Sequence, residues 1–106
     1  MTTKIKKSQA RDFLEKLTGG ALTFGRRLTA IRLGEEESQI VFAKRLKISP
    51  QHLCNIEKGL KIVSPERAAK FAKILGYSEK QFVRLALQDQ LNKQGLDHLA
   101  VNVQAA

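Results

Sequence analysis

The chain has 106 residues, of which 42% are hydrophobic, so it is long enough for one compact core and too short for two sizeable domains. A formal net charge of +9 favours a polyanionic partner, which for most proteins means nucleic acid. Most of this positive charge lies in residues 1–61, which hold thirteen basic and six acidic residues. No apolar run is long enough to cross a membrane.

Start and stop signals divide the chain into short helices. Residues 9–17, which follow Ser8 and precede Gly19-Gly20, are expected to form the first helix. Thr23 is expected to cap a second helix over 24–33, with Phe24, Leu28 and Ile31 facing inward and Gly34 as its stop. The acidic run 35–37 then precedes the positive end of the next helix, where negative charge is favourable.

Two helices follow at short spacing. Ser38 caps a predicted helix over 39–46, whose apolar positions are Ile40, Ala43 and Leu46, with Phe42 at the edge. Ser49-Pro50 starts a helix that runs to about Lys58, and Gly59 stops it.

The second half repeats these signals. Ser64-Pro65 opens a helix to Leu75 with buried Ala68, Ala69, Phe71, Ala72 and Leu75, and Gly76 ends it. Ser78 and Gln81 form a capping box for a last helix over 79–93, with an apolar stripe of Phe82, Leu85, Ala86 and Leu91. In the tail, Leu99, Val101 and Val103 alternate with other residues, which predicts a short strand. Such a strand would pair with a second copy, join a partner's sheet, or stay disordered.

Helices 39–46 and 50–58 have the pattern of a helix-turn-helix. With Gln39 as position one, the small Ala43 falls at the fifth position, where two crossing helices come closest. The buried hinge between the helices is expected at Ile48. The inner face of the second helix is expected to hold Leu53 and Ile56. If Leu53 and Ile56 face the core, Gln51, His52 and Asn55 face outward on the second helix.

The segments SQIVFAKRLKISPQHLCNIEKG and SPERAAKFAKILGY resemble the Cro/CI family of regulators, also called the XRE type. The resemblance covers roughly residues 22–77. It implies an all-α, lambda-repressor-like five-helix DNA-binding domain, here with an extra N-terminal helix and the short C-terminal strand as additions. Lys47 departs from the pattern, because the family usually has Gly there, and so does Pro50, which offers no hydrogen-bond donor.

We accordingly expect three regions: an N-terminal extension over 1–21, the helix-turn-helix domain over 22–77, and a dimerising helix and tail over 78–106. Gln51, Asn55 and His52 are the expected base-contacting residues, because side-chain amides can bond adenine in a bidentate manner. Gln39 is where the family commonly contacts a phosphate. The remaining phosphate candidates are basic, although each could equally be solvated: Arg26, Arg27, Lys44, Lys47, Lys58 and Lys61.

Other chemistry receives little support from the sequence. His52 and Cys54 are two apart on a helix and so do not face each other, and His98 is isolated. We therefore expect no enzyme activity, no metal and no cofactor. Cys54 is expected at the edge of the core, and as the one cysteine it favours a reducing cytoplasm. Glu57 would repel phosphate, so we expect it to pair with a basic residue.

Three functions fit these features. The first is a transcriptional repressor that binds a palindromic operator as a homodimer. The second is an antitoxin of the HigA type, which would bind its own promoter and also neutralise a small RelE/HigB-like toxin protein. The third is a nonspecific nucleic-acid or RNA-associated protein, whose binding would collapse as salt rises.

Overall fold

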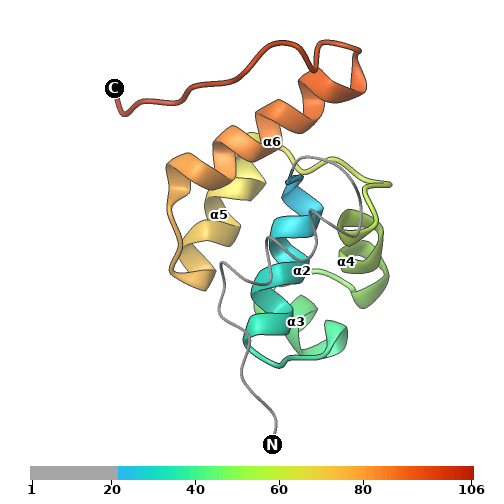
Figure 1. Ribbon diagram of the computed structural model, residues 1–106. Coiled ribbons are helices and arrows are strands. Elements are labelled where there is room, and N and C mark those ends of the chain that lie inside the picture. Colours follow the sequence, from blue (N-terminus) through green and yellow to red (C-terminus); the bar gives the residue numbers. More distant parts are fainter. Residues whose placement is uncertain (1–21) are drawn as a thin grey trace, which may run out of the picture. The chain divides into compact units, whose positions relative to one another are not determined.

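The computed structural model describes residues 22–106, so the helix expected over 9–17 lies outside the described residues. Within that part the fold is all-α, with five helices: α2 (Phe24–Gly34), α3 (Gln39–Leu46), α4 (Pro50–Glu57), α5 (Pro65–Leu75) and α6 (Glu79–Lys93) (Figure 1). They fall into two compact units, with α2, α3 and α4 in the first, which ends at Leu60, and α5 and α6 in the second, which begins at Lys61. No helix in 22–106 has both the length and the apolar character that crossing a membrane requires.

All five helices begin where the sequence predicts. At each start a hydroxyl accepts a hydrogen bond from the backbone N–H three residues later, which satisfies a group that the helix itself leaves unpaired. The donor–acceptor distances lie between 3.0 and 3.3 Å. The capping residues are Thr23, Ser38, Ser49, Ser64 and Ser78.

The end of α2 lies one residue beyond the predicted end. α2 includes Gly34, and the left-handed residue that follows it is Glu36, with φ 58°. The Glu37 N–H bonds the Arg32 carbonyl at 3.1 Å, which closes the turn around Glu36. Glycine is tolerated inside a helix at a cost of about 1 kcal/mol, so Gly34 need not mark the end. The contacts of Glu35 and Glu37 described below fix the turn instead.

In the first unit, α2 and α3 both pack against α4. Its buried apolar residues are Phe24, Leu28, Ala30, Ile31, Phe42, Ala43, Leu46, Leu53 and Ile56. The prediction for α3 is wrong at two positions, because Phe42 is fully buried and Ile40 is 68% exposed. Two residues apart on a helix point about 200° apart, so both cannot face inward. Burying the larger aromatic ring removes more apolar area from water.

Gly25 lies where α2 meets α4. A Cβ atom built on it would be 2.0 Å from the Ile56 carbonyl oxygen and 3.1 Å from that of Glu57. Only hydrogen fits in this space, and any larger side chain would force the helices apart. Gly25 therefore sets the spacing between α2 and α4, a role that the sequence pattern did not reveal.

In the second unit, α5 packs against α6. The buried residues are Val63, Ala68, Phe71, Ala72, Leu75, Phe82, Leu85 and Ala86. Ala69 and Leu91, which were expected to be buried with them, are half-buried. The rings of Tyr77 and Phe82 stack with their centroids 6.0 Å apart, which closes the turn between the helices.

Within one copy the tail after α6 forms no strand, which agrees with the lack of a partner strand in an all-α fold, and its pairing with a second copy or another sheet stays a prediction. Residues 100–106 have no regular secondary structure, although they run back alongside α6 (Figure 1). A strand is defined by backbone pairing, and the partner here is one side chain, that of Gln88. The alternation of Leu99, Val101 and Val103 therefore does not indicate a sheet within one copy of the chain.

Candidate nucleic-acid interface

The turn between α3 and α4 is tight and closed by backbone hydrogen bonds. The Ile48 N–H bonds the Ala43 carbonyl at 3.0 Å, and the Lys47 N–H bonds the Lys44 carbonyl at 3.2 Å. Lys47 is left-handed, with φ 62° and ψ 38°. This is the conformation that the family's glycine would favour, and for Lys it costs on the order of 1 kcal/mol. Ala43, at the fifth position, is fully buried.

α4 presents one apolar and one polar face. Leu53 and Ile56 are buried, as predicted, at 0% and 1% exposure. Gln51 is exposed, whereas His52 and Asn55 are half-buried. The Gln51 Nε2 donates to the Asn55 Oδ1 at 3.1 Å, so the two amides form the expected polar strip. His52 uses its backbone N–H to bond the Ser49 hydroxyl at 3.0 Å. Cys54 is half-buried, which agrees with the edge of the core.

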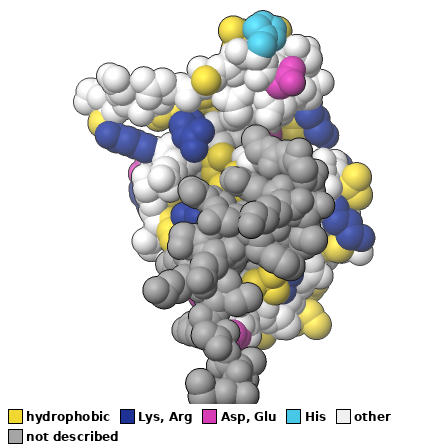
Figure 2. Space-filling model, in the orientation of Figure 1, with side chains coloured by type: hydrophobic (Ala, Val, Ile, Leu, Met, Phe, Trp, Pro, Cys, Tyr) yellow, Lys and Arg dark blue, Asp and Glu magenta, His cyan; other side chains and the backbone are white. Residues whose placement is uncertain are grey.

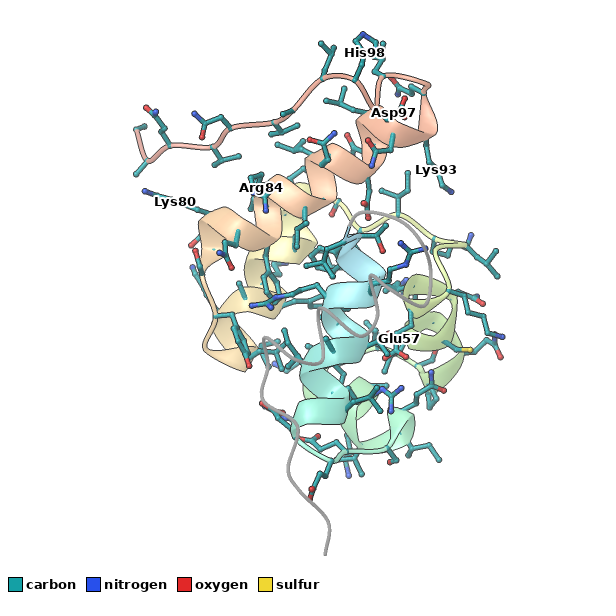
Figure 3. The ribbon with its side chains drawn as sticks, viewed as in Figure 1. Glu57, Lys80, Arg84, Lys93, Asp97 and His98 are labelled. Atoms are coloured by element: carbon teal, nitrogen blue, oxygen red, sulfur yellow. The ribbon has the colours of Figure 1, made fainter. Side chains whose placement is uncertain are left out.

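Glu57 holds α4 to the rest of the first unit. Its carboxylate accepts two hydrogen bonds from Arg32 of α2, from Nε at 2.8 Å and from Nη2 at 3.0 Å. It also accepts one from Gln39 Nε2 of α3 at 3.0 Å. The Arg32 and Glu57 side chains are only 14% and 6% exposed. Figure 3 labels Glu57 where the ribbons of α2 and α4 lie next to each other. The prediction that Glu57 pairs with a basic residue is confirmed, and one carboxylate joins three helices.

This network affects the expected role of Gln39. Its side chain lies at the start of α3 and donates to Glu57, so the same amide has one further N–H for another acceptor. A phosphate contact through that N–H or through the backbone remains a prediction. Arg32, the central donor of the network, was not among the sequence candidates because its partner is 25 residues away.

A second ion-pair cluster lies at the opposite end of α3. Arg45 bonds the carboxylates of Glu35 and Glu37, and its guanidinium lies 5.7 Å from the centre of the Phe42 ring. The hydrogen bond with Glu35, more than its other contacts, raises the pKa of Arg45. The acidic run therefore binds α3 by its side chains, whereas the sequence suggested only a helix-end effect.

The basic phosphate candidates differ in exposure. Lys44, Lys47, Lys58 and Lys61 are exposed, and Lys61 belongs to the second unit. Arg26 and Arg27 are half-buried on α2 and already make interactions within the protein. Figure 2 shows basic side chains next to hydrophobic ones on the side of the view where α4 lies. Within residues 22–106, no group of three or more His, Cys, Asp or Glu residues is arranged to hold a metal ion.

Residues 38–82 match the family model HTH_3, described as helix-turn-helix. These residues are therefore a helix-turn-helix domain. The match begins at the cap of α3 and extends into α6, so it includes the turn at Lys47 and the polar face of α4. The domain has a lambda-repressor-like fold and implies DNA binding, as the sequence resemblance predicted. No curated protein and no solved structure matches the chain significantly.

Proposed function

We propose that this protein is a sequence-specific transcription regulator that represses by binding a palindromic operator as a homodimer. The observation that carries the proposal is the Gln51–Asn55 amide pair, which lies on the outer face of a helix whose inner face is fixed by Leu53 and Ile56. α4 is then the recognition helix in the major groove, where base edges differ in their donors and acceptors.

Gln51 has the chemistry that base recognition requires. Its amide uses one N–H toward Asn55, which leaves a second N–H and the carbonyl oxygen for a base edge. Adenine offers an acceptor at N7 and a donor at N6, so one amide can satisfy both. The bond to Asn55 restricts the Gln51 side chain before DNA arrives, which lowers the entropy lost on binding. His52 is a further base or phosphate contact beside the pair.

Phosphate contacts would position this helix and would come from Gln39 and the basic residues around the motif. Each lysine that neutralises a phosphate releases counterions, so binding weakens as salt rises. A homodimer follows from the small number of bases that one α4 can read. Two copies of the helix, spaced about 34 Å apart on a palindrome, give the discrimination that one lacks.

Selection from random duplex DNA, followed by sequencing, identifies the operator. We then expect Gln51→Ala and Asn55→Ala each to cost roughly 1–3 kcal/mol in binding to that sequence and to relax the base preference. Asn92→Ala is the matched control, because Gln88 and Asn92 form the same kind of amide pair on α6, at 3.0 Å. It should leave specific binding unchanged. Lys58→Ala should weaken binding to all sequences alike.

Two results would contradict the proposal. The first is a selection that enriches no sequence while the protein binds random duplexes, with affinity that collapses as salt rises. The second is an unchanged base preference in both Gln51→Ala and Asn55→Ala, which would mean that another face reads the DNA. Circular dichroism of each variant verifies that the helices are intact.

A further inference from the structure

The side chain of Gln88 on α6 binds the tail as a neighbouring strand would. Its Nε2 donates to the Leu99 carbonyl at 2.8 Å, and its Oε1 accepts from the Val101 N–H at 2.9 Å. A carbonyl and the N–H two residues later are the two groups that one residue of a parallel strand contacts. The tail after Leu99 therefore lies along α6 and contains no turn. Its Val101 and Val103 side chains are half-buried.

The opposite edge of the tail is open. In an extended chain, the backbone groups of alternate residues point to opposite edges. Gln88 occupies the edge of Leu99 and Val101, so the other edge carries the N–H and C=O groups of Ala100, Asn102 and Gln104. These three residues are exposed, and the hydrogen bonds found among residues 22–106 include none from their backbones.

The tail also lacks the features that prevent edges from associating. Proteins usually protect an exposed edge with charged residues or proline. The whole chain has 27% charged residues, yet the segment LAVNVQAA, residues 99–106, has no Asp, Glu, Lys, Arg or Pro. An open and uncharged edge favours pairing with another extended segment.

We propose that residues 100–104 pair antiparallel with the same residues of a second copy, which forms a two-stranded sheet across the homodimer. A second copy can approach here because residues 99–106 carry no charge, whereas the net charge of +9 makes two copies repel each other over the rest of the surface. A two-fold axis at Asn102 places Asn102 opposite itself and Ala100 opposite Gln104, so no like charges oppose each other. This inference rests on the homodimer in the proposed function and assigns its contact surface.

Charge changes at Asn102 test the pairing. Sedimentation equilibrium of the full chain should show a dimer for the wild type. Asn102→Asp and Asn102→Lys should each weaken self-association by roughly fivefold or more, because like charges then face each other across the axis. An equal mixture of the two variants should restore the dimer, since opposite charges now pair. The same changes at the exposed Gln81 on α6 measure the effect of net charge alone.

The outcomes separate this inference from DNA recognition. A monomeric wild type, a dimer that neither Asn102 change weakens, or a mixture that stays monomeric would overturn the tail pairing. A tail-dependent dimer that shows no preference in the DNA selection would support the pairing and contradict the proposed function. Binding of one preferred duplex by a monomer would contradict the pairing and the homodimer and would support only the reading of bases by α4. Unchanged melting temperatures at dilutions where every variant is monomeric would show that the exposed position 102 acts on association rather than on folding.

Discussion

Two Gln–Asn pairs in this chain have the same spacing and different surroundings. Gln51 bonds Asn55 on α4 at 3.1 Å, and Gln88 bonds Asn92 on α6 at 3.0 Å. Gln88 also donates to the Leu99 carbonyl and accepts from the Val101 N–H. Both of its N–H groups are therefore used within the protein, whereas Gln51 has one N–H and its carbonyl oxygen available.

The difference shows that a residue pair in the sequence does not define a site. Both pairs arise from the same i, i+4 geometry of a helix. On α6 the amide is satisfied by the chain's own backbone, and on α4 it remains available to a ligand. The groups that are already bonded decide which pair could read a base, and those bonds depend on residues eleven and thirteen positions away.

The largest expected effect comes from removing Glu57, whose carboxylate bonds α4 to α2 and α3. Glu57→Ala leaves the mostly buried Arg32 without its carboxylate partner and with only the Glu37 carbonyl as an acceptor, which should destabilise the protein by about 3 kcal/mol in urea unfolding. Glu66→Ala removes an ion pair with Lys70 whose side chains are 82% and 70% exposed, so its effect should be under about 0.5 kcal/mol. Equal losses in the two variants would show that burial does not set the value of these pairs.

A smaller effect is expected from breaking the α6 pair itself. Gln88→Ala removes the hydrogen bonds that hold the tail, worth about 1–2 kcal/mol in local stability. Hydrogen exchange of the Val101 amide should accelerate roughly tenfold, since the tail then opens more often. Gln51→Ala is the matched control and should leave that amide unchanged. Persistent protection of Val101 in Gln88→Ala would mean that the half-buried valines, and not the amide, hold the tail.

The smallest effect concerns the ends of two helices. α3 ends at left-handed Lys47, whereas α6 is followed by left-handed Gly95. Lys47→Gly should therefore raise the free energy of unfolding by about 1 kcal/mol, because the strain at Lys47 is removed. The greater freedom of glycine in the unfolded chain offsets part of this gain. Gly95→Lys should lower it by a similar amount. Thermal unfolding measures both, and a loss of stability in Lys47→Gly would indicate that the Lys side chain itself stabilises the turn.

Local signals predicted the helices well. Five hydroxyl caps mark the helix starts, because each acts on a backbone N–H only three residues away. The inward orientation of Leu53 and Ile56, and so the outward position of Gln51, also follow from the local period. The end of α2 was off by one residue, the orientation of Phe42 was wrong, and the bonds of the tail to Gln88 were not predicted. In each case a contact with another element overrode the local pattern.

The ion pairs that the sequence did not identify join residues from different parts of the chain. Arg32 and Glu57 are 25 residues apart, and Arg45 meets Glu35 across a turn. A helical pattern ranks such charged residues as solvated, because it contains no information about the neighbouring helix. The sequence correctly predicted that Glu57 pairs with a basic residue, but only the folded structure identifies that residue as Arg32.

The close approach of Gly25 to the Ile56 carbonyl has a consequence for how DNA specificity could change. Backbone atoms make this contact on the α4 side, so it is independent of the side chains that α4 presents outward. Residues 51, 52 and 55 could therefore be replaced in search of new operators while the depth and tilt of the helix stay constant. A side chain at Gly25 would instead displace together all three side chains that we propose to contact bases.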